Sequence, residues 1–384
     1  MKYGIILIII CLFIFPAQAK YGGGTGEPSD PYLISTAEDL ILLGESPEDY
    51  DKHFILTADI DLDPNLPGGQ VFTDALIAQD PDGLVSRHMG FSFKGVLDGQ
   101  GHTIAHLHIE GEDGYDTGLF GSLSGIVKDL TLTDVVISGS PCGAIAGINS
   151  GGIILRCRVT GQLSGIEQVG GLVGTNWDGS LVECEAQVQV TGDEIVGGII
   201  GSCLSFSSES TMICCEVQAE VTGLRNVGGL IGRGEEVRII ECRSSGTVIG
   251  VDNVGGLIGY SYLNTVIFRS SANCDIAAEQ NAGGLAGGVI WNDGLFSIDC
   301  YARGSIAGSV VGGLVGEYSD IHAINCYSAY EIIPLEAEGN DTFVGGLFGN
   351  IFPPILPRRR LAIGCFWDAE LSGVSVSNGL DLPG

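Results

Sequence analysis

A short glycine block recurs through most of the chain, and this repeat constrains the fold more than any other feature. Its regular form is Gly-Gly-Leu-x-Gly, and nine copies begin at Thr117, Gly143, Gly170, Gly197, Gly228, Gly255, Gly283, Gly312 and Gly345. Successive copies start 26 to 33 residues apart. A period in this range is typical of a solenoid, in which each repeat contacts only its neighbours. We therefore expect one elongated repeat domain.

The segments between the glycine blocks favour strands over helices. Residues 180–190, for example, are rich in β-branched side chains, and glycine interrupts such segments too often for helices. A repeat of this length accommodates three short strands and three turns, which is one coil of a parallel β-helix. The sequence predicts an all-β, right-handed parallel β-helix solenoid of about nine coils.

Cysteine marks a second recurring position. It lies fourteen residues after the first glycine of the block in Cys157, Cys184, Cys242 and Cys326, and insertions displace Cys215, Cys300 and Cys365. We expect Phe268 to take this position in the unit that begins at Gly255. Free cysteine behaves as a small buried hydrophobe, so we predict an inward ladder of reduced thiols. Disulfides or a metal ladder are the alternatives, although no ligand spacing accompanies the thiols.

The ladder also predicts what its neighbours do. One of Cys214 and Cys215 must point outward, and Cys142, Cys203 and Cys274 fall outside the ladder. Residues that flank the ladder should face solvent. We therefore expect cross-strand ion pairs between Arg158 and Glu185 and between Glu216 and Arg243.

The two ends of the chain differ from the repeats. Ser35-Thr-Ala-Glu38 has capping-box spacing before Asp39-Leu-Ile-Leu-Leu43, with Gly44 as a stop, so residues 20–90 predict a cap with one short helix. Residues 54–62 predict a strand, and residues 93–104 a first full coil. A β-helix needs such an end to cover its core. The repeats extend over residues 91–368, with an interruption at 353–360, and residues 369–384 form a tail.

The first nineteen residues have the features of a secretory signal peptide. A basic residue, Lys2, precedes an apolar run over 5–15 and the small residues Ala17 and Ala19. We predict cleavage after Ala19 and a secreted or cell-surface protein without a later transmembrane segment. An uncleaved anchor is the alternative, but the apolar run is short for a membrane span.

The chain is strongly acidic, with 17 basic and 47 acidic residues and a net charge of −30. Such a surface repels nucleic acid. It suits cations or uncharged partners, and a solvated acidic coat is the simpler explanation.

The glycine block followed by a cysteine-containing strand resembles the GLUG repeat family over about residues 91–368. The segments 21–34, 59–63 and 97–104 are similar to the N-terminal part of many exported bacterial proteins with these repeats. The resemblance implies a secreted or cell-surface protein, adhesin-like or accessory to larger enzymes, and it supplies no catalytic residues. Some IgA-specific metallopeptidases contain such repeats, but their zinc motif His-Glu-x-x-His is absent from this sequence.

The turn after each glycine block is often aromatic and supplies the first group of candidate site residues. These are Trp177, Asp178, Tyr260, Tyr262, Trp291, Asp293 and Tyr318. Equivalent turns of a solenoid stack, so we expect a stripe of rings with nearby polar groups that binds sugars along one edge. The alternative is that the rings pack on their own loops.

Two further groups are candidate metal ligands. Asp59, Asp61 and Asp63 alternate along one predicted strand and could bind Ca²⁺, although a solvated face explains them equally well. His102, His106 and His108 could bind zinc, but third and fourth ligands are not evident. No other cofactor is expected.

Taken together, the sequence predicts a non-catalytic extracellular interaction protein. Its partner would be an extracellular polysaccharide or another surface protein. A polysaccharide lyase or glycoside hydrolase is the enzymatic alternative, because parallel β-helices also carry such enzymes. Glycoside hydrolysis needs two carboxylates across the scissile bond, and the sequence singles out no pair. A purely structural surface protein is the third possibility.

Overall fold

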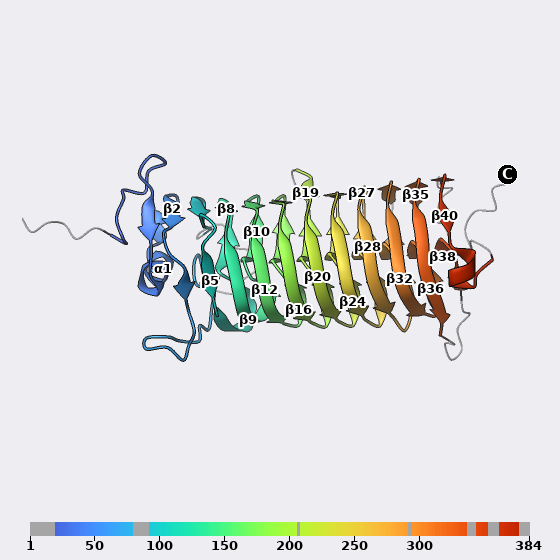
Figure 1. Cartoon of the computed structure of the whole chain (residues 1–384), viewed down its shortest axis with the longest axis horizontal. Coiled ribbons are helices and arrows are strands. Elements are labelled where there is room, and N and C mark those ends of the chain that lie inside the picture. Colours follow the sequence, from blue (N-terminus) through green and yellow to red (C-terminus); the bar gives the residue numbers. More distant parts are fainter. Residues whose placement is uncertain are drawn as a thin grey trace, which may run out of the picture.

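The computed structural model describes residues 20–79, 92–205, 208–290, 294–335, 343–351 and 361–375. The expected signal peptide, the interruption at 353–360 and residues 376–384 of the expected tail lie outside this range. The described chain is a rod of stacked coils, with a small cap at its N-terminal end (Figure 1). No helix in the described ranges is both long enough and apolar enough to cross a membrane.

Each coil contains four strands rather than the three that the sequence predicts. One coil runs through β14 (Val173–Trp177), β15 (Ser180–Val182), β16 (Glu185–Thr191) and β17 (Glu194–Gly197). The fourth strand arises because a corner at residues 192–193 separates β16 from β17. Strands at the same place in successive coils pair in parallel, so the rod consists of four stacks.

Stack 1 has twelve strands, and it continues into the cap. They are β1 (Tyr32–Ile34), β2 (His53–Leu56), β4 (Val96–Asp98), β8 (Ile126–Lys128), β11 (Ile153–Leu155), β15, β19 (Ser210–Ile213), β23 (Val237–Ile240), β27 (Thr265–Phe268), β31 (Leu295–Ile298), β35 (Ile321–Ile324) and β39 (Leu361–Ile363).

Stack 2 contains most of the long strands of the rod. Its strands are β3 (Ile60–Asp61), β5 (Thr103–Ala105), β9 (Thr131–Cys142), β12 (Arg158–Ser164), β16, β20 (Glu216–Thr222), β24 (Arg243–Ile249), β28 (Ser271–Ala277), β32 (Tyr301–Gly308), β36 (Tyr327–Pro334) and β40 (Phe366–Trp367). Several of them, such as β16, β20 and β24, are labelled in Figure 1.

Stack 3 holds the short strands β13 (Glu167–Gly170), β17, β21 (Arg225–Gly228), β25 (Asp252–Gly255), β29 (Asn281–Gly283), β33 (Val310–Gly312) and β37 (Phe343–Gly345). At the N-terminal end of stack 3, the strand β6 (His108–Thr117) pairs with the second half of β9. Stack 4 holds β7 (Phe120–Leu123), β10 (Ala146–Ser150), β14, β18 (Ile200–Leu204), β22 (Ile231–Glu235), β26 (Ile258–Tyr262), β30 (Ala286–Ile290), β34 (Val315–Tyr318) and β38 (Phe348–Ile351).

The glycine block forms the corner between stacks 3 and 4. Its first glycine ends a strand of stack 3, as Gly197 ends β17. A Cβ on Gly197 would lie 2.0 Å from the carbonyl oxygen of Ile200, so only glycine fits this sharp reversal. In the part of the chain that the structure describes, stack 4 has nine strands, joined by eight turns, which confirms the predicted parallel β-helix of about nine coils.

The cap covers the first coils and contains α1 (Ala37–Gly44). The capping box of α1 is formed by Thr36 and Asp39, one residue later than predicted. Leu40 and Leu43 of this helix are buried. The predicted strand over 54–62 is instead two strands, β2 and β3, because the chain turns a corner between stacks 1 and 2 at 57–59. A second short helix, α2 (Ala369–Ser372), follows the last coil.

Candidate functional site

The structure does not form the aromatic stripe that the sequence predicts along the turn edge. The parallel register of stack 4 pairs Tyr318 with Val289. Both belong to one row across the coils, which consists of Asn176, Cys203, Gly234, Ser261, Val289 and Tyr318. Side chains of this row point inward, and Tyr318 is 0% exposed. Its assignment as a ligand contact was wrong, because an offset of one residue in a strand reverses the face. Trp291 and Asp293 lie outside the described residues.

Three of the predicted rings are partly exposed but do not align as one row. Trp177 and Tyr262 occupy equivalent positions in β14 and β26, with Leu204 and Glu235 between them in the intervening coils. Tyr260 lies two residues before Tyr262 on the same outward face. The guanidinium of Arg233 lies 5.6 Å from the ring centre of Tyr262. Asp178 follows Trp177 in the turn and adopts a left-handed backbone, φ 55°.

A carboxylate pair that the sequence did not single out lies beside Tyr260. The amide Nδ2 of Asn281 donates to Asp252 Oδ1 at 2.9 Å and to Glu317 Oε2 at 3.3 Å. Burial, together with the charge of Asp252, raises the pKa of Glu317. Asp252 and Glu317 come from different stacks and from coils two turns apart, so no local sequence pattern connects them.

The two groups of predicted metal ligands contact each other in the structure. His102 Nδ1 lies 3.1 Å from Asp59 Oδ1, and His106 Nδ1 lies 2.8 Å from Asp61 Oδ1. The Asp61 carboxylate raises the pKa of His106. Asp63 instead accepts hydrogen bonds from the backbone and side chain of Asn65.

Each of these carboxylates therefore has its own partner. The third histidine, His108, lies 3.6 Å from Glu110. Across the described ranges, no group of three or more His, Cys, Asp and Glu side chains is gathered closely enough to hold a metal ion. Calcium binding by Asp59, Asp61 and Asp63 stays a prediction.

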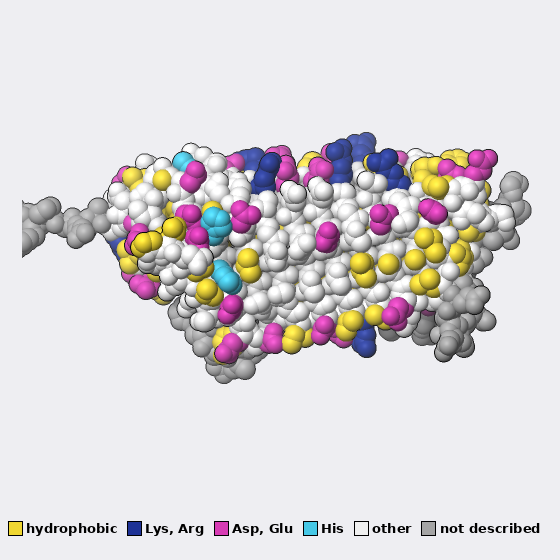
Figure 2. Space-filling view, turned by 60° about the horizontal axis from the view of Figure 1, so that its bottom comes forward, with side chains coloured by type: hydrophobic (Ala, Val, Ile, Leu, Met, Phe, Trp, Pro, Cys, Tyr) yellow, Lys and Arg dark blue, Asp and Glu magenta, His cyan; other side chains and the backbone are white. Residues whose placement is uncertain are grey.

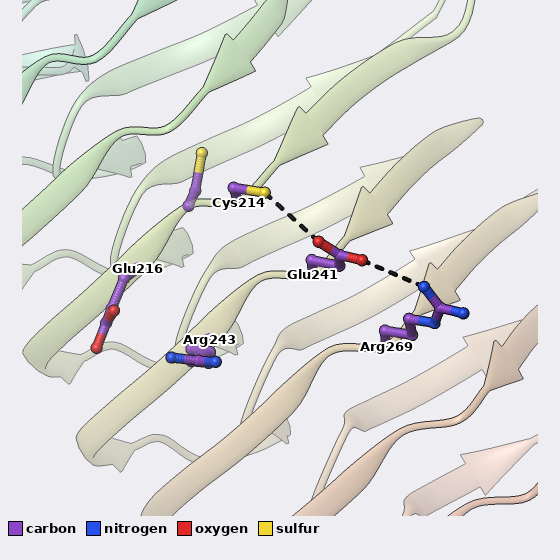
Figure 3. A pocket seen from close by; sticks show the side chains of 6 residues that line it. Cys214, Glu216, Glu241, Arg243 and Arg269 are labelled. Carbon is purple, nitrogen blue, oxygen red and sulfur yellow. Dashed lines mark hydrogen bonds and ion pairs between the residues drawn. The ribbon is translucent and has the colours of Figure 1, made fainter.

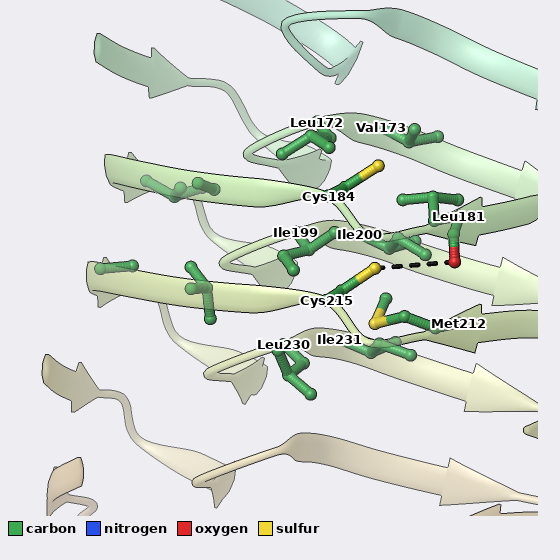
Figure 4. Packing of buried hydrophobic residues seen from close by; sticks show 14 of the residues in the cluster. Leu172, Val173, Leu181, Cys184, Ile199, Ile200, Met212, Cys215, Leu230 and Ile231 are labelled. Carbon is green, nitrogen blue, oxygen red and sulfur yellow. Dashed lines mark hydrogen bonds between the residues drawn. The ribbon is translucent and has the colours of Figure 1, made fainter. Parts of the chain in front are cut away.

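The cysteine ladder lies at the corner between stacks 1 and 2 (Figure 4). Cys157, Cys184, Cys215, Cys242, Cys300 and Cys326 are buried, Cys365 is partly buried, and all are free thiols. The thiols donate to carbonyls of the preceding coil, as Cys184 does to Ile154 at 3.4 Å and Cys215 to Leu181 at 3.6 Å.

One predicted member of the ladder is wrong. Register pairing places Phe268 opposite Ile240, which is an outward position. Ser270 occupies the ladder position instead, is 0% exposed, and accepts a hydrogen bond from the backbone of Cys242 at 3.0 Å. The shift arises from one additional residue between Tyr262 and Phe268, where both Leu263 and Asn264 have positive φ.

Cys214 is the residue of the Cys214-Cys215 pair that points outward (Figure 3). Its sulfur lies 3.7 Å from Glu241 Oε2, and Arg269 pairs with Glu241 at 3.5 Å. Partial burial and the Glu241 charge raise the pKa of Cys214, which disfavours the reactive thiolate.

The two predicted cross-strand ion pairs have different outcomes. Arg158 and Glu185 form theirs at 2.8 Å. Glu216 and Arg243 are opposite each other in register, but no ion pair joins these two described residues. The predicted adjacency of Glu216 and Arg243 is therefore confirmed, and the predicted ion pair between them is wrong.

A polar groove, which the sequence did not predict, lies on the outer face of stack 2. The outward side chains of β12, β16, β20 and β24 form four rows, of which the first is the charged row Arg158, Glu185, Glu216 and Arg243. The other three rows are Thr160, Gln187, Gln218 and Ser245; Gln162, Gln189, Glu220 and Thr247; and Ser164, Thr191, Thr222 and Ile249. Of these twelve side chains only Glu220 is charged. Figure 2 shows this face as a broad white band, with Lys and Arg side chains gathered at its upper rim.

We name the depression between the first two of these rows the amide groove. Gln187 and Gln218 line one side, and Gln162, Gln189, Glu220 and Thr247 line the other. Its floor is formed by Gly161, Val188, Ala219 and Gly246, and its volume is about 410 Å³. One signal could have revealed it, since Gln187 and Gln218 each lie three residues after a ladder cysteine.

Comparisons with known proteins match short parts of long relatives. No family model matches the chain. Halomucin of Haloquadratum walsbyi is 32% identical over 152 residues, which are 38% of this chain and 2% of that relative. A candidate Gly-rich membrane protein of Evansella cellulosilytica is 33% identical over 164 residues, 38% of this chain and 17% of that protein. The chain thus spans less than a fifth of the curated relatives that it matches.

One solved structure resembles the whole rod. A candidate immunoglobulin A1 protease from Bacteroides ovatus superposes with a TM-score of 0.51 and 18% identity, covering 88% of this chain and 87% of that chain. At this identity the similarity shows a shared fold, the parallel β-helix.

Proposed function

We propose that the chain is a secreted or cell-surface, non-catalytic interaction protein with carbohydrate as its ligand class. The amide groove carries this proposal, because it is a hydrogen-bonding surface with a single charged lining residue, Glu220, in a chain of net charge −30. The names of the two relatives, halomucin and a Gly-rich membrane protein, support a place at the cell surface. The resemblance to GLUG repeats, and the signal peptide that the first nineteen residues predict, belong to the same proposal.

The side chains of the groove suit polyhydroxylated ligands. A glutamine amide both donates and accepts hydrogen bonds, and so does a threonine hydroxyl, which matches the dual character of a sugar hydroxyl. The groove residues sit on strands held in place by pairing on both sides. A rigid scaffold of this kind limits the ordering cost of binding.

A glycan array probed with the mature protein, residues 20–384, tests the proposal. We expect specific binding to a subset of glycans. A protein that retained no glycan, soluble or insoluble, would contradict carbohydrate as the ligand class. It would instead favour another surface protein as the partner, or a purely structural role.

The carboxylate pair of Asp252 and Glu317 favours a second candidate function, that of a glycoside hydrolase. Glu317 has the raised pKa of a general acid, and Asp252 lies near it as a second carboxylate. Assays for new reducing ends and for unsaturated products on every bound glycan distinguish the two functions. Product formation that disappears in Glu317→Gln would establish the enzyme, whereas binding without product supports the interaction protein.

A further inference from the structure

We infer that the amide groove takes one chain of a linear, neutral polysaccharide, lying parallel to the rod axis across β12, β16, β20 and β24. This inference rests on the proposed function and specifies its ligand and site. It does not use the aromatic turn edge, where the described rings do not align.

The direction of the groove follows from the register. Gln187 and Gln218 are opposite each other in neighbouring coils, and so are Gln162 and Gln189. Each row therefore runs across the strands and along the rod. Coils of a parallel sheet are about 4.8 Å apart, so four of them extend over about 14 Å. A site of this form fits an extended chain better than a single sugar.

The floor of the groove is backbone. Its residues are Gly161, Val188, Ala219 and Gly246, which occupy the fourth position of each strand and point inward, so their main chain lies between the two outward rows. Gly161 and Gly246 adopt φ of 144° and 113°. A Cβ on Gly246 would lie 2.1 Å from the carbonyl oxygen of Ala219, which shows how closely the backbones approach there. The ligand would therefore contact backbone as well as amide side chains.

The charge of the groove selects a neutral polymer. Its only charged lining residue is Glu220, whose carboxylate accepts a hydrogen bond from Gln189 Nε2 at 3.0 Å. No Arg or Lys lines the groove, so a uronate or sulfate group would find no counter-charge there. The overall negative charge of the protein would repel a polyanion further. Within the groove itself, a polycation would find one counter-charge, that of Glu220.

No aromatic side chain lines the groove either, so hydrogen bonds must supply most of the affinity. Each hydrogen bond contributes little on its own because it replaces one to water. Affinity should therefore increase with the length of the oligosaccharide until the four coils are filled, and then level off. A monosaccharide should bind far more weakly than the polymer.

The test uses the mature protein with dextran, a soluble β-1,3-glucan and galactomannan as neutral probes, and with alginate and polygalacturonate as acidic ones. Affinity electrophoresis and calorimetry give the dissociation constants. The test variant is Gln187→Ala with Gln218→Ala. The matched control is Thr191→Ala with Thr222→Ala, which changes exposed residues of the same two strands outside the groove.

We expect at least one neutral polymer to bind, with affinity reduced about tenfold or more in the glutamine variant and unchanged in the threonine control. Neutral-glycan binding that survives the glutamine variant overturns the inference but leaves the proposed function standing. Preference for the acidic polymers, or equal affinity for a monosaccharide and the polymer, also overturns it. Absence of binding to any glycan contradicts the proposed function as well.

Discussion

Replacement of Gly228 by alanine should destabilise the rod severely, because this glycine forms a corner between stacks 3 and 4. An added Cβ would lie 2.0 Å from the carbonyl oxygen of Ile231 and 2.6 Å from the backbone nitrogen of Gly259 in the next coil. Reaching even a 3.0 Å separation from the oxygen requires a shift of 1.0 Å (3.0 − 2.0). Because both obstacles are backbone atoms within paired strands, a change of side-chain rotamer gives no relief.

Overpacking that side chains can absorb costs roughly 1–3 kcal/mol, so we expect Gly228→Ala to cost at least about 3 kcal/mol. Gly234→Ala is the matched control, because its Cβ would meet side-chain atoms and no backbone atom, namely Cγ1 of Val237 at 3.0 Å and atoms of Ile258 at 3.8 Å or more. Urea unfolding followed by circular dichroism should show a much lower midpoint for Gly228→Ala than for Gly234→Ala. Equal midpoints for the two variants would refute the steric reasoning.

Three further predictions concern the ladder, the exposed thiol and the carboxylate pair. Ser270→Cys should fold with a stability within about 1 kcal/mol of the parent, since it completes a row of buried thiols; a large loss in urea unfolding would contradict the register. A thiol reagent should label Cys214 first in the native protein, and the buried ladder only after denaturation without reductant; ladder thiols that stayed unreactive even then would indicate disulfides. Because the folded pKa of Glu317 is raised, its contribution to stability is present at low pH and is lost as pH rises through that pKa. Glu317→Gln should therefore raise the unfolding midpoint at pH 7 and not at pH 4, and a variant less stable at pH 7 would show that the carboxylate is not strained.

The fold could be predicted from sequence because a solenoid repeats its signals. The glycine corner and the ladder cysteine recur in coil after coil, so a single degenerate copy does not hide the period. The division of each coil into four strands was not predictable in the same way. The corner between β16 and β17 is a Gly-Asp pair, which looks like an ordinary loop in a single repeat.

Errors at individual positions came from shifts of one residue. Trp177 and Tyr262 lie seven residues after the first glycine of their blocks, whereas Tyr318 lies six after its own. Since alternate residues of a strand face opposite sides, this difference alone places Tyr318 in the core. The additional residue before Phe268 moved the ladder position to Ser270 for the same reason. Counting offsets from the glycine block would have predicted the faces of Trp177, Tyr262 and Tyr318 correctly.

The candidate sites were harder to predict because they join residues from different coils. Asp252 and Glu317 meet only through the amide of Asn281, and each looks like one acidic residue among 47. The amide groove also joins residues from different coils, but its lining contains a single acidic residue, Glu220. In a rod whose coils differ mainly at outward positions, one row can change its chemistry without disturbing the core. Four consecutive coils carry Gln, Thr, Ser and Ile at twelve outward positions with a single carboxylate, while the charged side chains gather at the rim beyond them. Most of the acidic residues thus lend the protein solubility from outside the groove, where Glu220 alone is charged, and the groove stays open to an uncharged partner.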